Sequence, residues 1–429
     1  MQVVRVLGKL EPGGAQLSLL RVSRELERRH GVRTTLVVGD ASHDGLRLAQ
    51  RYDVPTIAFR TGSAVHPRRN LQWQQSTRFA AWLTDKLGGA DLVHAHMVGA
   101  WWAVAQVIDP VTPLIATEHN EVNWTTRRVR SLQPAARRID RFYAMGPAAC
   151  QFAITAGVRT EVIRPARSPV AGLSAAPRAG LRTPRLTFAG RFCQDKGPDV
   201  LVEAISLLDR SDLSAYLLGA GPLRARLADR IHQLGLSGRV FMPGWVDKPW
   251  TYIAGSAVHV VPSREEAWSQ SAVLGLGLGV PVVGTHVDGL AHTLSQSRGV
   301  TVAPDDPLAL SEAISDALSG RSPIDRAAGI RYARGFTTTR VAEFYLAEYQ
   351  AMLTSRLALS RLRSKTPAKE TPGQCTRGSG QREDHSQVNQ GPQPGHVGPP
   401  PTPESAGASR GSHHRRRSNA PVGPDVGGN

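Results

Sequence analysis

The sequence predicts two doubly wound α/β domains followed by a disordered carboxyl-terminal tail. Three observations support this fold class. Apolar runs of strand length alternate with helix-length segments up to about residue 349, and glycine turns follow several of these runs. The chain has 429 residues with 41% hydrophobic content, which is enough to bury two cores. Beyond about residue 361, proline, glycine, serine and arginine dominate, so burial cannot offset the entropy of ordering the tail.

The first half of the chain contains the amino-terminal series of strands. They are predicted at residues 3–7, 34–38, 56–59, 92–94, 114–117 and 142–144. Gly13 and Gly14 follow the first strand and precede an amphipathic helix with Leu17, Leu20 and Leu26 on one face. Because glycine lacks a Cβ, we expect this turn to bring backbone close to a ligand across a cleft between the domains. An ordinary tight turn is the alternative.

The first of three glycine turns in the second half follows a strand predicted at residues 186–189. It contains Gly190, Arg191, Lys196 and Gly197. Lysine is scarce in this chain, with 6 lysines against 46 arginines, so a lysine between two glycines is not the default cation. A diphosphate there would be held by helix N–H groups, with Arg191 as a fork donor and Lys196 as a point charge.

The second and third turns complete the pattern. A strand-like run stops at Gly219 and Gly221, and a helical pattern follows. Another buried-strand run ends at Pro262, and a helix-length segment then separates Glu266 from a strand at residues 280–284. In a parallel sheet such turns meet beyond the carboxyl ends of the strands. Together they predict an anion site in which Glu266 faces hydroxyls of a sugar or ribose, although any one turn alone would suit solvated charges.

These segments resemble the retaining, nucleotide-sugar-dependent glycosyltransferases of the GT-B fold, of the family-four type. That family's second domain carries G-R-x-x-x-x-K-G, G-x-G-P-L, P-S-x-x-E and G-x-P-V-V. The counterparts here are residues 190–197, 219–223, 262–266 and 279–283. The likeness extends to residues 12–16, 93–96 and 117–120 and covers nearly everything up to about Tyr349. It implies two facing Rossmann-like domains, with the donor site mostly in the second and the acceptor site mostly in the first.

The resemblance also implies a reaction. A glycosyl unit would pass from a nucleoside diphosphate sugar to a glycan, a lipid-linked acceptor or a small molecule, with retention at the anomeric carbon. The implied catalytic residues are His119 near the anomeric carbon, Arg191 and Lys196 on the departing diphosphate, and Glu266 on the sugar. The implied donor-binding residues are Gly13, Gly14, Gly190, Gly219, Gly221, Ser269, Gln270 and Ser271. No cofactor is expected beyond the nucleotide sugar, which is a co-substrate.

One position departs from the family pattern. The family has a second glutamate eight positions after the first, expected to hold the ribose, and this chain has Leu274 there. The surrounding segment contains no acid, and it carries Gly275 and Gly277, each of which costs about 1 kcal/mol in a helix interior relative to alanine. We therefore expect a weak helix. The ribose contacts are expected instead from Ser269, Gln270 or Ser271.

Two other functions stay open. Hydrolysis or epimerisation of a nucleotide sugar would suit the same architecture. A degenerate protein that binds a nucleotide sugar, a lipid or a partner glycosyltransferase without turnover is favoured by Leu274 and opposed by the intact Arg191, Lys196 and Glu266.

Metal and disulfide chemistry are not expected. His94 and His96 share one strand face, but no third ligand is recognisable, so His96 suits a cleft residue better than a metal ligand. Cys150, Cys193 and Cys375 are widely spaced, which argues against a disulfide framework or a zinc site. Cys193, within the first turn, is expected to be a bystander.

The sequence favours a cytoplasmic protein that can also contact an anionic membrane peripherally. It has no run of about 20 apolar residues and no signal-peptide pattern at its amino terminus. Arginines gather between residues 127 and 141 and at Arg60, Arg68 and Arg69, where they would attract lipid headgroups or an anionic acceptor, a solvated face being the alternative. The net charge of +17 is diffuse and no nucleic-acid module is present, so no specific nucleic acid is expected.

Tryptophan has two interpretations. Trp101, Trp102 and Trp124 could stack on sugar rings or enter a membrane interface, but a role in the core is favoured.

The predicted segments of the whole chain are 1–165 (acceptor-side domain), 166–184 (linker), 185–340 (donor domain), 341–360 (terminal helix crossing back to the first domain) and 361–429 (basic tail).

Overall fold

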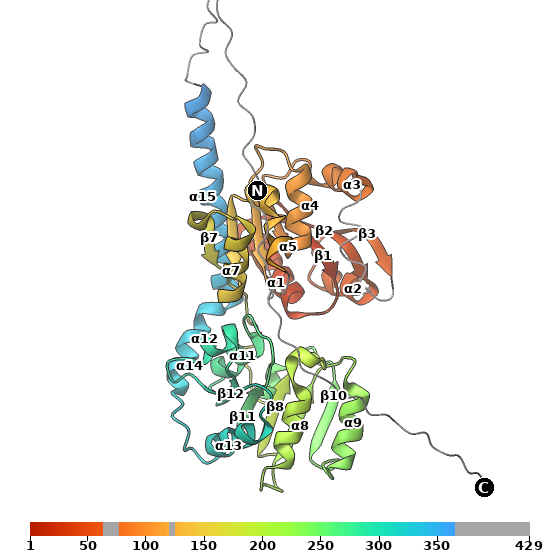
Figure 1. Ribbon diagram of the computed structural model, residues 1–429, viewed down its shortest axis with the longest axis vertical. Coiled ribbons are helices and arrows are strands. Elements are labelled where there is room, and N and C mark those ends of the chain that lie inside the picture. Colours follow the sequence, from red (N-terminus) through yellow and green to blue (C-terminus); the bar gives the residue numbers. More distant parts are fainter. Residues whose placement is uncertain (63–76, 120–124, 365–429) are drawn as a thin grey trace, which may run out of the picture. The chain divides into compact units, whose positions relative to one another are not determined.

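The structure is a computed structural model that describes residues 1–62, 77–119 and 125–364. It contains two sheets, both assembled from parallel strand pairs (Figure 1). The first has the order β3-β2-β1-β4-β5-β6-β7, and the second has the order β10-β9-β8-β11-β12-β13. Because crossover helices connect these strands, both sheets are doubly wound and Rossmann-like, and the predicted fold class is confirmed.

The first sheet and its helices come from the first 165 residues. Its strands are β1 (Gln2–Leu10), β2 (Arg33–Ser42), β3 (Thr56–Gly62), β4 (Leu92–His96), β5 (Leu114–Glu118), β6 (Arg141–Ala144) and β7 (Ile163–Pro165). Its helices are α1 (Gly14–His30), α2 (His43–Arg51), α3 (Thr77–Leu87), α4 (Val98–Val107), α5 (Thr126–Arg130), α6 (Gln133–Ala136) and α7 (Pro147–Ala156), with a short 3-10 turn η2 (Thr160–Val162). Strand β7, which pairs with β6, was not predicted from the sequence.

The second sheet follows a stretch without helix or strand, residues 166–184. Its strands are β8 (Arg185–Ala189), β9 (Ser214–Leu218), β10 (Val240–Gly244), β11 (Val258–Val261), β12 (Val282–Thr285) and β13 (Val300–Val302). The helices are η3 (Gln194–Lys196), α8 (Pro198–Ser206), α9 (Arg224–Gln233), α10 (Trp250–Ile253), α11 (Gln270–Gly277), α12 (Asp288–Leu294), α13 (Pro307–Leu318), α14 (Arg326–Ala333), η4 (Arg334–Phe336) and α15 (Thr338–Ser364).

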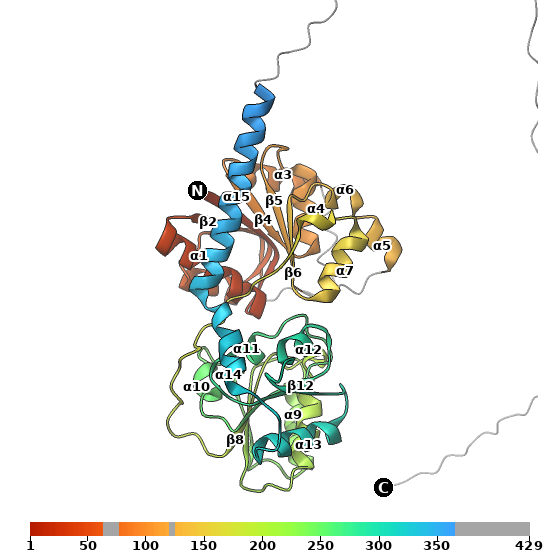
Figure 2. The same ribbon diagram turned by 90° about the vertical axis from the view of Figure 1, so that its left-hand side faces the viewer.

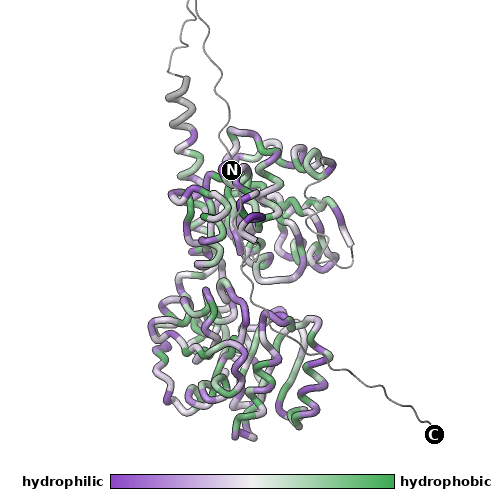
Figure 3. The backbone as a smooth tube through the Cα atoms, viewed as in Figure 1, coloured by the Kyte–Doolittle hydropathy of each residue, from purple (hydrophilic) through white to green (hydrophobic). Residues whose placement is uncertain are grey.

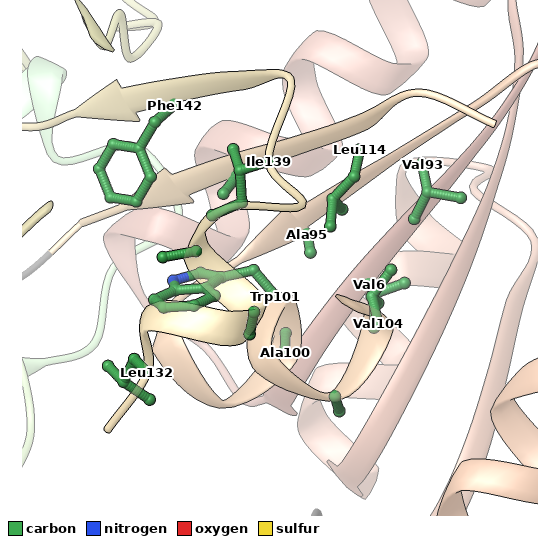
Figure 4. Packing of buried hydrophobic residues seen from close by; sticks show 14 of the residues in the cluster. Val6, Val93, Ala95, Ala100, Trp101, Val104, Leu114, Leu132, Ile139 and Phe142 are labelled. Carbon is green, nitrogen blue, oxygen red and sulfur yellow. The ribbon is translucent and has the colours of Figure 1, made fainter. Parts of the chain in front are cut away.

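Each sheet is covered by apolar helix faces. In the first core Trp101 of α4 is fully buried and lies edge-on to Phe142 of β6, with Phe152 of α7 also in ring contact (Figure 4). The core role favoured for Trp101 is therefore confirmed. Along the chain the backbone alternates between hydrophobic and hydrophilic stretches, as expected for amphipathic elements (Figure 3).

Helix α15 completes the face of the first sheet opposite to α4. It begins at Thr338 and ends at Ser364, outside both limits of the predicted range 341–360, and it runs beside α1 (Figures 1 and 2). Val341, Tyr345 and Tyr349 of this helix are buried in one cluster with Val3 and Tyr143 of the sheet. The last described helix is therefore part of the first core.

The residues between β7 and β8 are anchored even though they form no regular element. Val170 is buried, and its N–H donates to the Phe336 carbonyl at 2.8 Å. Arg178 and Arg182 stack over the rings of Tyr252 and Phe241. Lack of hydrophobic periodicity therefore did not mean lack of packing here.

None of the helices in the described ranges combines the length and apolar character needed to cross a membrane. Several sequence predictions concern positions outside the described residues. These are Arg68, Arg69, Trp124, Cys375 and the tail from residue 365 onward.

Candidate active site

The first two predicted glycine turns pack directly against each other beyond β8 and β9. The Gly190 N–H donates to the Leu218 carbonyl at 3.0 Å. Gly219 has φ +151°, and a Cβ there would lie 1.8 Å from the Gly190 carbonyl oxygen; at Gly221, with φ +157°, a Cβ would lie 2.4 Å from the Phe192 carbonyl oxygen. Only glycine fits these two positions.

The third turn closes onto the first. Gly197 has φ +59°, and a Cβ there would lie 2.0 Å from the Pro262 carbonyl oxygen. The backbone N–H groups of Arg264 and Glu265 both donate to the Asp195 carbonyl, at 2.9 and 3.2 Å. The carboxyl ends of β8, β9 and β11 therefore meet at one place, as expected for ligand sites in open parallel sheets.

Lys196 and Glu266 are in direct contact at this place. The Lys196 Nζ atom donates to Glu266 Oε2 at 3.0 Å and to the Glu265 carbonyl at 3.2 Å. Their side chains are 21% and 14% exposed, so the pair is shielded from water but reachable. Burial raises the pKa of Glu266 above its ordinary value, although Lys196 acts in the opposite direction.

A second carboxylate faces both cations of the turn. Asp195 Oδ2 lies 3.3 Å from Arg191 Nη2 and 3.9 Å from Lys196 Nζ. Arg191 is the more exposed cation, with 59% of its side chain accessible. Burial raises the pKa of the neighbouring Cys193 thiol to about 11, so this cysteine is a protonated bystander at neutral pH.

The polar residues predicted on α11 are mostly engaged by the protein itself. Ser269 is buried, and its Oγ accepts from the backbone N–H of Ala272, which makes it the N-cap of α11. Gln270 Nε2 donates to the Gly14 carbonyl at 2.7 Å, and a Cβ on Gly14 would lie 3.0 Å from that nitrogen. The Ser271 side chain is partly buried and lies 3.4 Å from Ser269 Oγ, which leaves it the member of this group most available to a ligand.

Gly13 and Gly14, at the turn before α1, have different neighbours. Gly14 contacts Gln270 as described, whereas a Cβ on Gly13 would meet only the flexible Gln16 side chain, at 2.7 Å from Oε1. Gly13 has extended backbone with φ −173°, so its conformation does not require glycine. A Cβ at either position would therefore meet the end of a flexible glutamine side chain, and what distinguishes Gly14 is the hydrogen bond that its carbonyl accepts from Gln270.

Leu274 lies in the apolar core beneath α11, with 5% of its surface exposed. The two glycines beside it allow close packing. A Cβ on Gly275 would lie 2.9 Å from Val282 and 3.1 Å from the ring of His259, and a Cβ on Gly277 would lie 2.3 Å from Leu173. Propensity alone predicted a weak helix, but these close contacts hold α11 against its neighbours.

Three histidines form a stacked column at the carboxyl end of β4 and β5. The rings of His94 and His96 are 4.2 Å apart and nearly parallel, and those of His96 and His119 are 5.4 Å apart. His96 Nδ1 lies 3.1 Å from His119 Nε2. His94 is held at both nitrogens, by Tyr349 Oη and Thr117 Oγ1, each at 2.7 Å.

The column is electrically neutral. Burial, followed by the nearby positive charge of Arg5, lowers the pKa of His119 to about 4. Burial likewise holds the pKa values of His94 and His96 well below their ordinary range. Arg5 is itself buried and donates from Nη2 to Tyr349 Oη at 3.0 Å. Within the described ranges, no three His, Cys, Asp or Glu side chains gather closely enough to hold a metal ion.

Comparison with known proteins shows the family of this chain. The solved structure of HepE from Anabaena in complex with UDP and glucose matches with a TM-score of 0.69 at 17% identity, covering 82% of this chain and 100% of that chain. Residues 12–170 match the family described as Glycosyltransferase Family 4, and residues 183–320 match the one described as Glycosyl transferases group 1. This chain is a GT-B glycosyltransferase.

This glycosyltransferase is similar in sequence to curated proteins that are named as glycosyltransferases or glucosyltransferases. It is 26% identical over 302 residues to a D-inositol 3-phosphate glycosyltransferase of Jonesia denitrificans, covering 63% of this chain and 68% of the relative. It is 25% identical over 388 residues to a 2-deoxystreptamine glucosyltransferase of Streptomyces kanamyceticus, covering 79% and 99%. The family predicted from the sequence motifs is thus confirmed.

Several residues of the glycosyltransferase site were not singled out from the sequence. Asp195 and Arg264 stand inside recognised motifs, directly before Lys196 and after Ser263, and that adjacency was the available signal. Arg5 and Tyr349 gave no local signal, because they lie 344 positions apart in the sequence and only the fold brings them together.

Proposed function

We propose that this glycosyltransferase moves a sugar from a nucleoside diphosphate sugar to an acceptor with retention at the anomeric carbon. The contact between Lys196 and Glu266 is the observation that carries the proposal. It brings a cation suited to a leaving diphosphate next to a carboxylate suited to sugar hydroxyls. Both sit where three strand ends converge, and the glycine turns leave backbone close to the ligand position.

Lys196 and Arg191 would hold the diphosphate. As the bond between the anomeric carbon and the phosphate oxygen breaks, negative charge grows on that oxygen, and fixed cations stabilise it. Lys196 would contact the phosphate. Its contact with Glu266 would at the same time orient the carboxylate. Glu266 would accept hydrogen bonds from sugar hydroxyls, and its shielding from water strengthens those bonds.

His119 would contact the transferred sugar from the first domain. Its contact with His96 uses Nε2, so Nδ1 is the atom we assign to a sugar hydroxyl. The imidazole is neutral at pH 7, because its pKa lies near 4. It would therefore orient the sugar by hydrogen bonding rather than supply a charge.

Retention in this proposal needs no nucleophile from the protein. The acceptor oxygen would attack on the face from which the diphosphate leaves, and the leaving phosphate oxygen would take the acceptor proton. Support for the donor class comes from solved relatives whose descriptions include UDP, UDP with glucose and UDP-glucose. The acceptor is left as a hydroxyl compound, since the named relatives act on different ones.

The test is a donor panel on the purified protein. UDP-, GDP- and ADP-sugars are compared by thermal stabilisation and by release of free nucleoside diphosphate. One donor is expected to stabilise the protein and to release its diphosphate slowly. Lys196→Ala should then reduce that release by orders of magnitude, whereas Lys86→Ala, on α3 and paired with Asp85, should not. Equal rates for Lys196→Ala and the native protein would overturn the assignment.

A second candidate function is binding of a nucleotide sugar without turnover. It is favoured by Leu274, which is buried in apolar surroundings and offers no carboxylate to a ribose. The same panel separates the two functions. Stabilisation by a donor without release, in the presence of a broad set of hydroxyl acceptors, would support binding alone, and release with free sugar as the only product would indicate a hydrolase.

A further inference from the structure

Arg264 makes an unusually complete set of contacts beside the phosphate turn. Its Nη1 and Nη2 atoms donate to the two carboxylate oxygens of Asp199 at 2.9 and 2.8 Å. Nε donates to Asp305 Oδ1 at 2.6 Å, and Nη1 also donates to the Gln194 carbonyl at 2.7 Å. Only 18% of the side chain is exposed, and four of the five guanidinium N–H groups donate to protein oxygens.

These partners belong to three different segments. Gln194 opens the 3-10 turn η3, Asp199 lies in the first turn of α8, and Asp305 lies in the loop before α13 with φ +59°. A planar fork that binds a carboxylate with two parallel hydrogen bonds fixes orientation as well as distance. Arg264 therefore sets how η3 and α8 are placed relative to the end of β11.

Lys196 lies inside the segment that Arg264 holds. The side chain of Arg264 binds Gln194 before the lysine and Asp199 after it. The backbone N–H of Arg264 donates to the Asp195 carbonyl at 2.9 Å. From the next residue along, the Glu265 carbonyl accepts from Lys196 Nζ at 3.2 Å. The lysine is thus tied on both sides of its own position.

We propose that Arg264 is a positioning residue for the donor diphosphate, acting through Lys196 and the turn that carries it. This inference rests on the proposed function. Two carboxylates surround the guanidinium, so its charge is compensated within the protein and it is not itself a phosphate ligand. Its role is to keep the lysine directed at one point, which is a condition for tight anion binding.

The experiment measures diphosphate binding directly, without an acceptor. Calorimetry gives the Kd of UDP, GDP and ADP for the native full-length chain, and the ligand that binds is then used for Arg264→Met and Arg264→Lys. We expect Kd to rise about tenfold or more in Arg264→Met. Arg264→Lys should bind the nucleoside diphosphate nearly as weakly as Arg264→Met, since an ammonium cannot form two parallel hydrogen bonds with Asp199.

A matched control separates positioning from general stability. Arg239 also links backbone segments of this domain, through the Leu213 and Arg210 carbonyls, but it does not touch the three turns. Arg239→Met should lower the melting temperature while Kd, measured well below melting, stays within about twofold. A folded Arg264→Met whose Kd is also within twofold of native would overturn the proposal, because a purely structural arginine gives that result.

A second line of evidence uses Lys196. If Arg264 acts through the lysine, adding Arg264→Met to Lys196→Ala should weaken binding much less than Arg264→Met does alone, and fully additive effects would overturn the inference. Asp199→Asn breaks the same fork from its other end and replaces Arg264→Met if that variant does not fold. Failure of the native chain to bind any nucleoside diphosphate would overturn the proposed function itself, which distinguishes the two failures.

Discussion

The Nδ1 atom of His96 lies 3.1 Å from Nε2 of His119, and the two imidazole rings stack with their planes 21° apart. Because both rings are neutral, one of these nitrogens must carry the proton and the other must accept it. His96 therefore fixes both the orientation of His119 and the tautomers compatible with it. His94, stacked beneath and held at both nitrogens, supports His96 in turn.

Removing the ring of His96 should slow turnover without weakening diphosphate binding. In His96→Ala, His119 loses its only fixed side-chain partner in the column, and a misplacement of about 1 Å costs up to about 100-fold in rate. We expect kcat for diphosphate release to fall between about 10- and 100-fold, with the Kd of the nucleoside diphosphate unchanged. His232→Ala, on the exposed side of α9, is the control. An unchanged kcat would show that His119 is positioned without His96.

Replacing Asp195 by asparagine should tighten diphosphate binding. Its Oδ2 atom faces both Arg191 and Lys196, so a diphosphate must compete with it for these cations. Exposed ion pairs of this kind contribute about 0.2 to 1 kcal/mol, which corresponds to a gain of roughly 1.4- to fivefold in affinity. Titration calorimetry at low salt measures this change in the affinity for the diphosphate. Asp209→Asn makes the same charge change at an exposed position, and an equal gain there would indicate a long-range effect of charge alone.

Restoring the family's glutamate at position 274 should not restore a ribose contact. Leu274 is buried among apolar side chains, so a carboxylate there would be desolvated without a partner. We expect Leu274→Glu to lower the free energy of unfolding by about 2 kcal/mol or more, whereas Leu274→Met should cost less than about 1.5 kcal/mol. Chemical denaturation measures the free energy of unfolding of both variants. Tighter donor binding by Leu274→Glu would instead mean that this position can reach the nucleotide.

Stability should fall as the pH is lowered from about 6.5 towards 4. Burial depresses the pKa of His94, His96, His119 and His259, the last two to about 4, so an unfolded chain binds more protons than the folded one in this window. Their stabilisation is complete above 6.5 and is lost as pH falls through the folded pKa values. Each kcal/mol lost lowers the melting temperature by roughly 2 to 4 °C.

Thermal melts between pH 6.5 and 4 test this loss of stability. One group, Glu266, changes the stability in the opposite direction. The raised pKa of Glu266 contributes stability below about 4.5 that is lost as pH rises, and it opposes four histidines. His259→Gln should flatten the dependence, because it removes one titrating group from the core. A melting temperature that rises on acidification would contradict the assignment of neutral buried histidines.

The parts of the fold that the sequence predicted are those with local signals. The three glycine turns were found because tight backbone approach demands glycine at Gly219 and Gly221, which are visible without any partner. The strands that were missed, β7, β10 and β13, all lie at or next to a sheet edge in the strand order. β7 and β10 each contain a proline, and β7 and β13 have only three residues. Neither an alternating hydrophobic pattern nor the length of an apolar run therefore identified these three segments as strands.

The supporting contacts of the site were harder to predict because they join distant parts of the sequence. Tyr349 reaches His94 across 255 positions, and Arg264 reaches Asp199 across 65. Charge and residue type alone do not say which acid an arginine will meet. The motifs predicted candidate ligand-binding residues, and the fold was needed to find the residues that hold them in place.

Helix α15 has a consequence for the order in which this protein acquires its structure. The face of the first sheet that carries Val3, His94 and Tyr143 is closed by Tyr345 and Tyr349, which are synthesised only after the whole second sheet. While the ribosome makes the second half, the nascent first half must keep that face uncovered, with apolar and histidine side chains accessible to chaperones. Synthesis of α15, rather than completion of residue 165, is therefore the event that lets the amino-terminal half mature.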